Sequence, residues 1–136
     1  MAAREYELAL KAYYRTAGAE GMRPELRASI GTANLGLARL DQAEAQLRKA
    51  VDEDENLVSA WNNLGVVLVE KGEIGEASRV FRTAFALDAG NSPEIRENLR
   101  MALANMNTSP YTETTNNEDF KLVPQDGGQF LLLSPS

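Results

Sequence analysis

The residues that could carry acid–base or metal chemistry in this chain are carboxylates, because its 136 residues include no histidine and no cysteine. Without these residue types a chain cannot build a thiolate nucleophile, an imidazole base or a zinc site of Cys and His ligands. The densest acidic run is Asp52–Glu55, and further acids recur at Glu70, Glu73 and Glu76. Carboxylates form a catalytic or metal site only when the fold brings them together in one pocket.

Neither group of acids has the spacing of such a site. The four acids at 52–55 are consecutive and end a predicted helix, so we interpret them as a solvated turn rather than as a calcium loop. Glu70, Glu73 and Glu76 are expected on an exposed helix surface. The glycine pair at 127–128 has no following helix, which a phosphate-binding loop requires. The sequence therefore predicts a protein that is not an enzyme and binds no cofactor or metal.

Composition narrows the classes of partner. Hydrophobic residues make up 43% of the chain and charged residues 25%, which is typical of a globular domain. The formal net charge of −6 disfavours nucleic acid, because phosphate binding needs a basic face. No apolar run approaches the roughly 18 residues of a membrane-spanning helix. The chain begins inside a predicted helix without a signal peptide, so we expect a leader or anchor to precede this point in a full-length precursor.

A period of 34 residues organises the elements that carry these side chains. When the sequence is shifted by this period, Gly65 falls over Gly31 and Phe81 falls over Leu47. Each unit contains two stretches with the apolar spacing of an amphipathic helix. In the second unit, Trp61 begins the apolar face of the first stretch, and Gly72 separates it from the second. Small residues such as Gly65 are expected where the two helices approach closely, and Trp61 is expected in the core.

The pattern of the second unit resembles the tetratricopeptide repeat. It reads Trp61-x2-Leu64-Gly65-x2-Leu68, followed by Ala77-x3-Phe81-x2-Ala84. The resemblance implies an all-α fold, a right-handed helical solenoid of about two and a half helix pairs with a further C-terminal helix. The usual proline near the end of the unit is missing, and the first unit matches the pattern more weakly.

The chain divides into three predicted parts. Residues 1–106 form the repeat domain, with a half-unit at 3–17, units at 24–57 and 58–91, and a closing helix at 92–106 that begins with Ser92 as its N-cap. Residues 107–119 have the composition of a polar linker. In residues 120–136, two apolar runs flank Asp-Gly-Gly, which indicates a β-hairpin. Because an isolated hairpin is marginal in water, we expect it to lie on the repeats, to extend a partner's sheet or to stay disordered.

The concave groove of such a solenoid is its usual binding surface. Val66 and Val69 lie opposite the core side of their helix, so we expect an apolar ligand or the chain's own tail to cover them. The tail offers a second surface. The predicted groove residues are Ala28, Thr32, Leu35, Ser59, Asn62, Val66, Val69, Arg96 and Arg100. The predicted tail residues are Phe120, Leu122, Val123, Phe130, Leu131, Leu132 and Leu133.

Two kinds of protein partner follow from finer resemblances. Residues 60–103, together with the FKLV and QFLLL of the tail, resemble tetratricopeptide proteins of the tight-adherence (Flp) pilus assembly system. That resemblance implies a pilotin-like outer-membrane lipoprotein that assists the pilus secretin in the periplasm, although its lipid-bearing cysteine is absent here. The alternative is a cytoplasmic co-chaperone or assembly adaptor that binds an extended peptide. A carboxylate clamp is not expected, because Ala28 and Asn62 stand where its cations would be needed. We expect a homodimer or an upstream helix at the N-terminal end.

Overall fold

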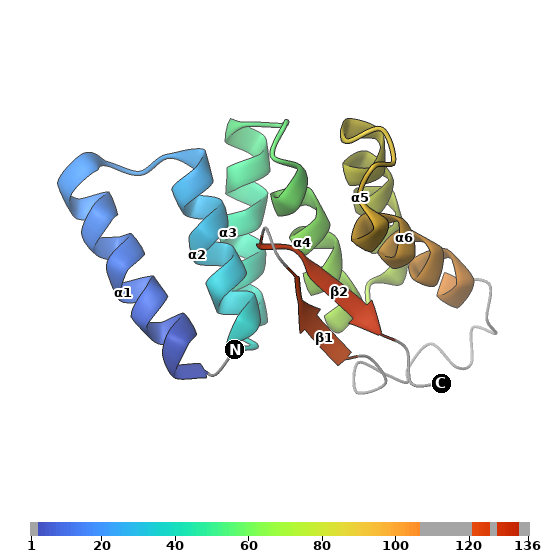
Figure 1. Cartoon of the computed structure of the whole chain (residues 1–136), viewed down its shortest axis with the longest axis horizontal. Coiled ribbons are helices and arrows are strands. Elements are labelled where there is room, and N and C mark those ends of the chain that lie inside the picture. Colours follow the sequence, from blue (N-terminus) through green and yellow to red (C-terminus); the bar gives the residue numbers. More distant parts are fainter. Residues whose placement is uncertain (1–2, 107–120, 126–127, 134–136) are drawn as a thin grey trace.

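The computed structural model describes residues 3–106, 121–125 and 128–133, and within them the chain forms six helices and a two-stranded sheet (Figure 1). The helices are α1 (Ala3–Glu20), α2 (Pro24–Gly36), α3 (Leu40–Glu53), α4 (Val58–Glu70), α5 (Ile74–Leu87) and α6 (Pro93–Met106). The strands are β1 (Lys121–Pro124) and β2 (Phe130–Leu133). Each helix packs against the next one in the chain, so the predicted all-α solenoid with a C-terminal hairpin is confirmed.

Glycine allows the helices of each pair to approach closely, as the repeat pattern predicted. A Cβ atom at Gly65 of α4 would lie 2.5 Å from Cε1 of Phe81 in α5. At the equivalent place in the first pair, a Cβ at Gly31 would lie 2.7 Å from Cγ of Leu47. Phe81 and Leu47 are both fully buried, so each glycine leaves the space that a large core side chain fills.

The ends of the helices also follow the sequence. Gly72 has a positive φ of 84°, and the amide of Glu73 donates to the Leu68 carbonyl at 2.8 Å, which is the Schellman closure of α4. At the start of α6, the Ser92 hydroxyl accepts a hydrogen bond from the amide of Ile95 at 3.3 Å. The serine N-cap predicted for the closing helix is therefore present.

Trp61 differs from its expected place in the core. Its ring packs against the core but stays half-buried at the start of α4, and its indole N–H donates to the Glu55 carbonyl at 2.9 Å. The position lies next to the loop that joins α3 to α4, where one edge of the ring faces backbone. The tryptophan thus fastens a loop between two helix pairs as well as filling volume.

The hairpin lies on the helices, across α4 and beside α6 (Figure 1). Its strands are antiparallel, with Leu122 opposite Leu132 and Pro124 opposite Phe130. Phe130 and Leu132 are 3% and 2% exposed and belong to the same hydrophobic core as the helices. Of the three outcomes expected for the tail, the structure shows packing on the repeats. The predicted linker at 107–119 and the tail residue Phe120 lie outside the described residues.

Among the described residues, no helix combines the length and the hydrophobicity that crossing a membrane requires.

Candidate functional site

Three buried asparagines hold the hairpin on the concave side of the stack. Asn62 and Asn63 follow one another in α4, Asn98 lies in α6, and none of the three is exposed to solvent. A buried amide group is costly unless its hydrogen bonds are satisfied. Here the satisfying partners are backbone groups of the tail. We call Asn62, Asn63 and Asn98 the asparagine site.

The asparagine site binds the free edge of β2. The Phe130 carbonyl accepts two hydrogen bonds, from Nδ2 of Asn98 at 2.9 Å and from Nδ2 of Asn62 at 3.1 Å. The Phe130 amide donates to Oδ1 of Asn63 at 3.0 Å, and the Leu132 amide donates to Oδ1 of Asn98 at 2.9 Å. Phe130 and Leu132 therefore turn their backbone groups to the helices, because backbone groups of successive residues in a strand point to opposite edges.

Hydrogen bonds between the side chains fix the orientation of the amides. Nδ2 of Asn98 donates to Oδ1 of Asn62 at 3.0 Å, and Nδ2 of Asn63 donates both to Oγ1 of Thr32 at 3.0 Å and to the Gly128 carbonyl at 2.7 Å. The network runs from α2 through α4 to α6. Each nitrogen thus faces acceptors, and this is the orientation in which Asn62 and Asn98 can donate to the Phe130 carbonyl and Asn63 can accept from the Phe130 amide.

Both valines for which a cover was expected are buried, and the tail lies beside one of them, Val69. Val66 and Val69 are 0% and 1% exposed. Val69 and Leu132 line the same small gap with Ala102 of α6, so the apolar side of β2 lies on this part of α4. Leu35 is also fully buried, within the core. The predicted groove residues at 35 in α2 and at 62, 66 and 69 in α4 are therefore buried within the protein rather than open to a partner.

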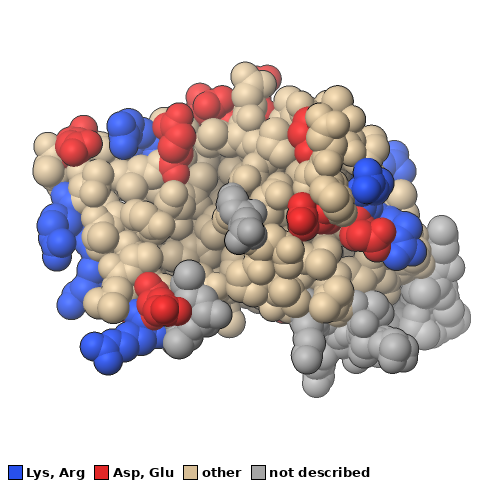
Figure 2. Space-filling view, viewed as in Figure 1, with Lys and Arg blue, Asp and Glu red and all other residues tan. Residues whose placement is uncertain are grey.

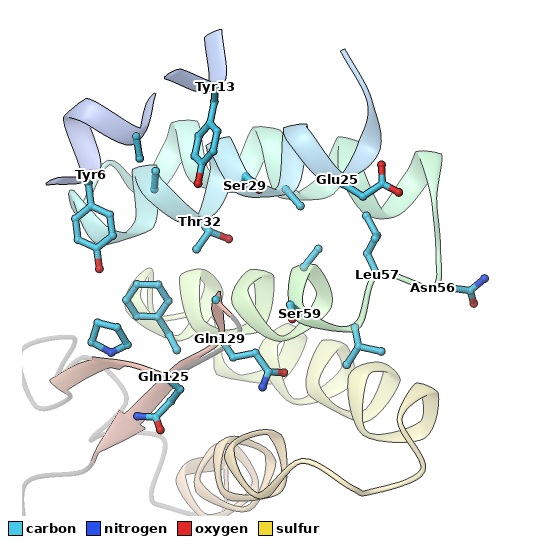
Figure 3. A pocket seen from close by; sticks show the side chains of 18 residues that line it. Tyr6, Tyr13, Glu25, Ser29, Thr32, Asn56, Leu57, Ser59, Gln125 and Gln129 are labelled. Carbon is cyan, nitrogen blue, oxygen red and sulfur yellow. The ribbon is translucent and has the colours of Figure 1, made fainter. Parts of the chain in front are cut away.

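A hollow of about 620 Å³ remains on the concave side, beside the hairpin (Figure 3). Helices α1, α2 and α4 and the turn of the hairpin surround it, and Tyr6 and Tyr13 project into it from α1. Burial raises the pKa of the Tyr6 hydroxyl, with a smaller contribution from Glu5. Among the described residues of its lining, Glu25 is the only charged side chain.

The predicted groove residues divide between these two regions and the surface. Ala28, Thr32 and Ser59 line the hollow. Arg96 and Arg100 do not: Arg96 donates to the Gly90 carbonyl at 3.2 Å, and Arg100 pairs with Glu97 at 2.6 Å on the exposed side of α6. The tail residues Leu122, Val123 and Leu131 are half-buried, and Leu133 is 45% exposed.

Charged side chains lie elsewhere and pair between helices. On the face in Figure 2, uncharged residues cover most of the middle, and charges gather towards the edges. Nζ of Lys71 lies 2.8 Å from Oδ1 of Asp41 and 2.7 Å from Oε1 of Glu44. Arg48 bridges Glu44 and Glu76 at 2.8 and 2.9 Å. In the described parts of the chain, no three acids converge as metal ligands would.

Glu70 does not lie on the exposed helix surface that the sequence predicted. The side chain at the end of α4 is half-buried, and its Oε2 has no hydrogen-bond partner among the described residues. Burial raises the pKa of this carboxyl from 4.5 to about 7. The helix C-terminus, which disfavours negative charge, acts in the same direction.

The comparison with known families agrees with this architecture. Residues 58–91, which comprise α4, α5 and the turn after them, match the family model of the tetratricopeptide repeat. Residues 58–91 are thus similar to one tetratricopeptide repeat. A related sequence, tetratricopeptide repeat protein 8 of Caenorhabditis elegans, is 30% identical over 91 residues, which is 65% of this chain but 18% of that protein. The chain therefore spans less than a fifth of this relative.

Solved tetratricopeptide domains share the fold. The first such domain of Spaghetti (RPAP3), bound to the HSP90 peptide SRMEEVD, has a TM-score of 0.71 and 20% identity, with 76% of this chain and 82% of that one covered. The TPR2B domain of yeast Sti1, in a complex with pHsp70, has a TM-score of 0.69 and 22% identity, covering 75% and 86%. The second domain of human RPAP3, with the HSP70 peptide SGPTIEEVD, has a TM-score of 0.62 and 25% identity, covering 76% and 82%.

Sequence reasoning missed two members of the asparagine site, Asn63 and Asn98. Asparagine has low helix propensity because its side chain competes for backbone hydrogen bonds. The sequence did contain a signal, because asparagines occur in the interior of both α4 and α6. Such asparagines indicate side-chain amides with hydrogen-bond partners outside their own helices.

Proposed function

We propose that this chain is a non-enzymatic scaffold that binds a segment of a partner protein on its concave face. The observation that carries the proposal is the hollow of about 620 Å³ beside the hairpin. Extended concave surfaces are the usual binding faces of helical solenoids. The hollow is large enough for several side chains, and helices rather than loops form most of its wall.

The lining indicates the chemistry of the segment. Tyr6 and Tyr13 offer ring faces with a hydroxyl at the end, and Ser29 and Ser59 add small polar groups. Aromatic rings give large contact areas at a low cost in conformational entropy. Glu25 is the one charge in the described lining and favours a basic group on the partner. A mostly uncharged segment with a Lys or Arg near one end fits these features.

The proposed partner is a pilus-assembly protein, the secretin in the first instance. Its support is the resemblance of residues 60–103 and of the tail to tetratricopeptide proteins of the tight-adherence system. In this proposal the protein acts in the periplasm, and a lipid anchor on the full-length precursor holds it at the outer membrane. A homodimer through α1, the end of the stack, is part of the same proposal.

A cytoplasmic adaptor is the second candidate, because similar solved domains carry chaperone peptides. Those two peptides end in Glu-Glu-Val-Asp and are acidic. Binding an acidic peptide requires cations, whereas the described lining of this hollow contains none and includes Glu25. An adaptor for a neutral or basic segment therefore fits better than a receptor for such acidic ends.

Affinity capture from the envelope and cytoplasmic fractions of the source cell, with identification of bound proteins by mass spectrometry, tests the proposal. Ser59→Trp fills the hollow and should abolish enrichment of the secretin, whereas Lys49→Trp, at an exposed position of α3, should leave it unchanged. Equal enrichment by wild type and Ser59→Trp, with both proteins folded by circular dichroism, would refute binding in the hollow. Enrichment of a cytoplasmic chaperone in place of the secretin would favour the adaptor.

A further inference from the structure

The asparagine site binds the tail in a way that another chain could reproduce. We propose that it is a strand-binding site that accepts, in place of β2, an extended partner segment with two apolar residues two positions apart. The inference rests on the proposed function in taking the concave face as the partner surface. Beyond the proposed function, it names a second binding location on that face and the chemistry of the segment that binds there. It also states that this segment competes with the tail.

The contacts of the asparagine site with the tail are to backbone atoms. The three amides bind the Gly128 carbonyl, the amide and carbonyl of Phe130, and the Leu132 amide. Every residue other than proline offers these groups. The site therefore recognises an extended conformation rather than a sequence. It excludes proline at the two positions that correspond to Phe130 and Leu132, since each must donate its N–H.

Side-chain selectivity comes from the two residues that point towards the helices. Phe130 and Leu132 lie on one side of the strand and are 3% and 2% exposed, and Leu132 borders Val69 and Ala102. Leu131 and Leu133 lie on the other side and are half-buried and 45% exposed. Because side chains alternate along a strand, the requirement is an apolar residue, any residue, then a second apolar residue.

The tail has little structure of its own to resist exchange. β2 pairs on its other edge with β1, a strand of four residues, and a hairpin of two strands is marginal in water by itself. Its position on the helices therefore depends mainly on the asparagine site and on Phe130 and Leu132, with smaller contributions from Leu122 against the core and from the bond between Gln129 and Ser92 at 3.4 Å. An incoming segment of the same pattern supplies the same hydrogen bonds and the same apolar contacts. The tail keeps one advantage, an effective concentration in the millimolar range that comes from being part of the chain.

The experiment uses the tail's own sequence as the probe. A labelled, acetylated and amidated peptide GGQFLLL, which corresponds to residues 127–133, is titrated into the full chain and into a full chain with Phe130→Ser and Leu132→Ser. The double variant should bind the peptide at least tenfold more tightly than wild type, because its tail competes less. Adding Asn98→Leu to it should abolish binding. A control peptide GGQFLPL, with proline at the position of Leu132, should not bind.

Absence of binding by a double variant that keeps its helical circular dichroism would overturn the inference. Should the double variant not fold, hydrogen exchange in the wild-type chain provides the measurement. Excess peptide should speed exchange at the amides of Phe130 and Leu132 while the core of α4 stays protected, and unchanged exchange would equally overturn it. Gly128 and Phe130 also border the hollow, but Ser59 makes none of the hydrogen bonds to the strand, so peptide binding should survive Ser59→Trp. If Ser59→Trp abolishes secretin capture but the peptide does not bind the double variant, the proposed function stands and only this inference is refuted.

Discussion

Replacing Asn98 by alanine tests the hydrogen-bond network that joins the tail to the helices. The change removes the partner of the Leu132 amide and the partner of Oδ1 of Asn62, whereas the Phe130 carbonyl keeps its bond from Nδ2 of Asn62. Asn98 is fully buried, so water does not readily replace the lost groups. Leaving a buried polar group without a partner costs about 1–3 kcal/mol. With two such groups, we expect the free energy of unfolding to fall by roughly 2–6 kcal/mol.

This decrease in the free energy of unfolding cannot exceed the free energy with which the tail docks on the helices. Beyond that limit the tail detaches while the helices stay folded. Two measurements separate these outcomes: urea unfolding followed by circular dichroism, and hydrogen exchange at the Leu132 amide. Asn34→Ala is the matched control, since Asn34 is a buried asparagine of α2 whose Nδ2 donates to the Ile30 carbonyl of its own helix at 3.0 Å. A change below about 0.5 kcal/mol for Asn98→Ala, together with undiminished protection of Leu132, would refute the assignment of the network as the main attachment of the tail.

Three further perturbations have defined outcomes. Because burial raises the Glu70 pKa from 4.5 to about 7, the contribution of this group to stability is present below pH 4.5 and is lost as the pH rises to about 7. Glu70→Gln should therefore stabilise the protein at pH 8 by about 1–2 kcal/mol, after allowance for its partial exposure, and by nothing at pH 4 in thermal unfolding. Gly65→Ala should cost about 1–3 kcal/mol in urea unfolding, because its methyl group meets the Phe81 ring, and an unchanged midpoint would contradict the close packing. Gly72→Ala, at a positive φ with open space around it, should cost about 1 kcal/mol in urea unfolding from backbone strain alone, and a loss above about 2 kcal/mol would contradict the open surroundings of this glycine.

Local signals in the sequence predicted most of the fold. Gly65 and Gly72 have roles that follow from their positions in the period, and Ser92 caps α6 because its side chain reaches an amide three residues on. The Asp-Gly-Gly segment between two apolar runs predicted the hairpin. Trp61 is less buried than the sequence predicted. The period indicates which side of the helix a residue lies on, but not how much of its side chain the adjoining loop covers.

The candidate site depended on contacts that no local pattern contains. Val66 and Val69 were expected to need an apolar group packed over them. Leu132, which packs beside Val69, lies 63 residues further along the chain, so no local pattern links the two. Asn98 and Phe130 meet only because the stack and the tail return to the same place. The hollow likewise combines α1 with the turn of the hairpin, from opposite ends of the chain.

The Phe130 carbonyl accepts from α4 and from α6 at the same time. One atom of the tail thus ties together two helices that are not consecutive. The tail therefore acts as a brace between α4 and α6, in addition to the direct bond from Nδ2 of Asn98 to Oδ1 of Asn62 and to the packing of both helices on α5. We expect the distance between α4 and α6 to vary more once the tail is removed, because the two hydrogen bonds that meet at the Phe130 carbonyl are then lost.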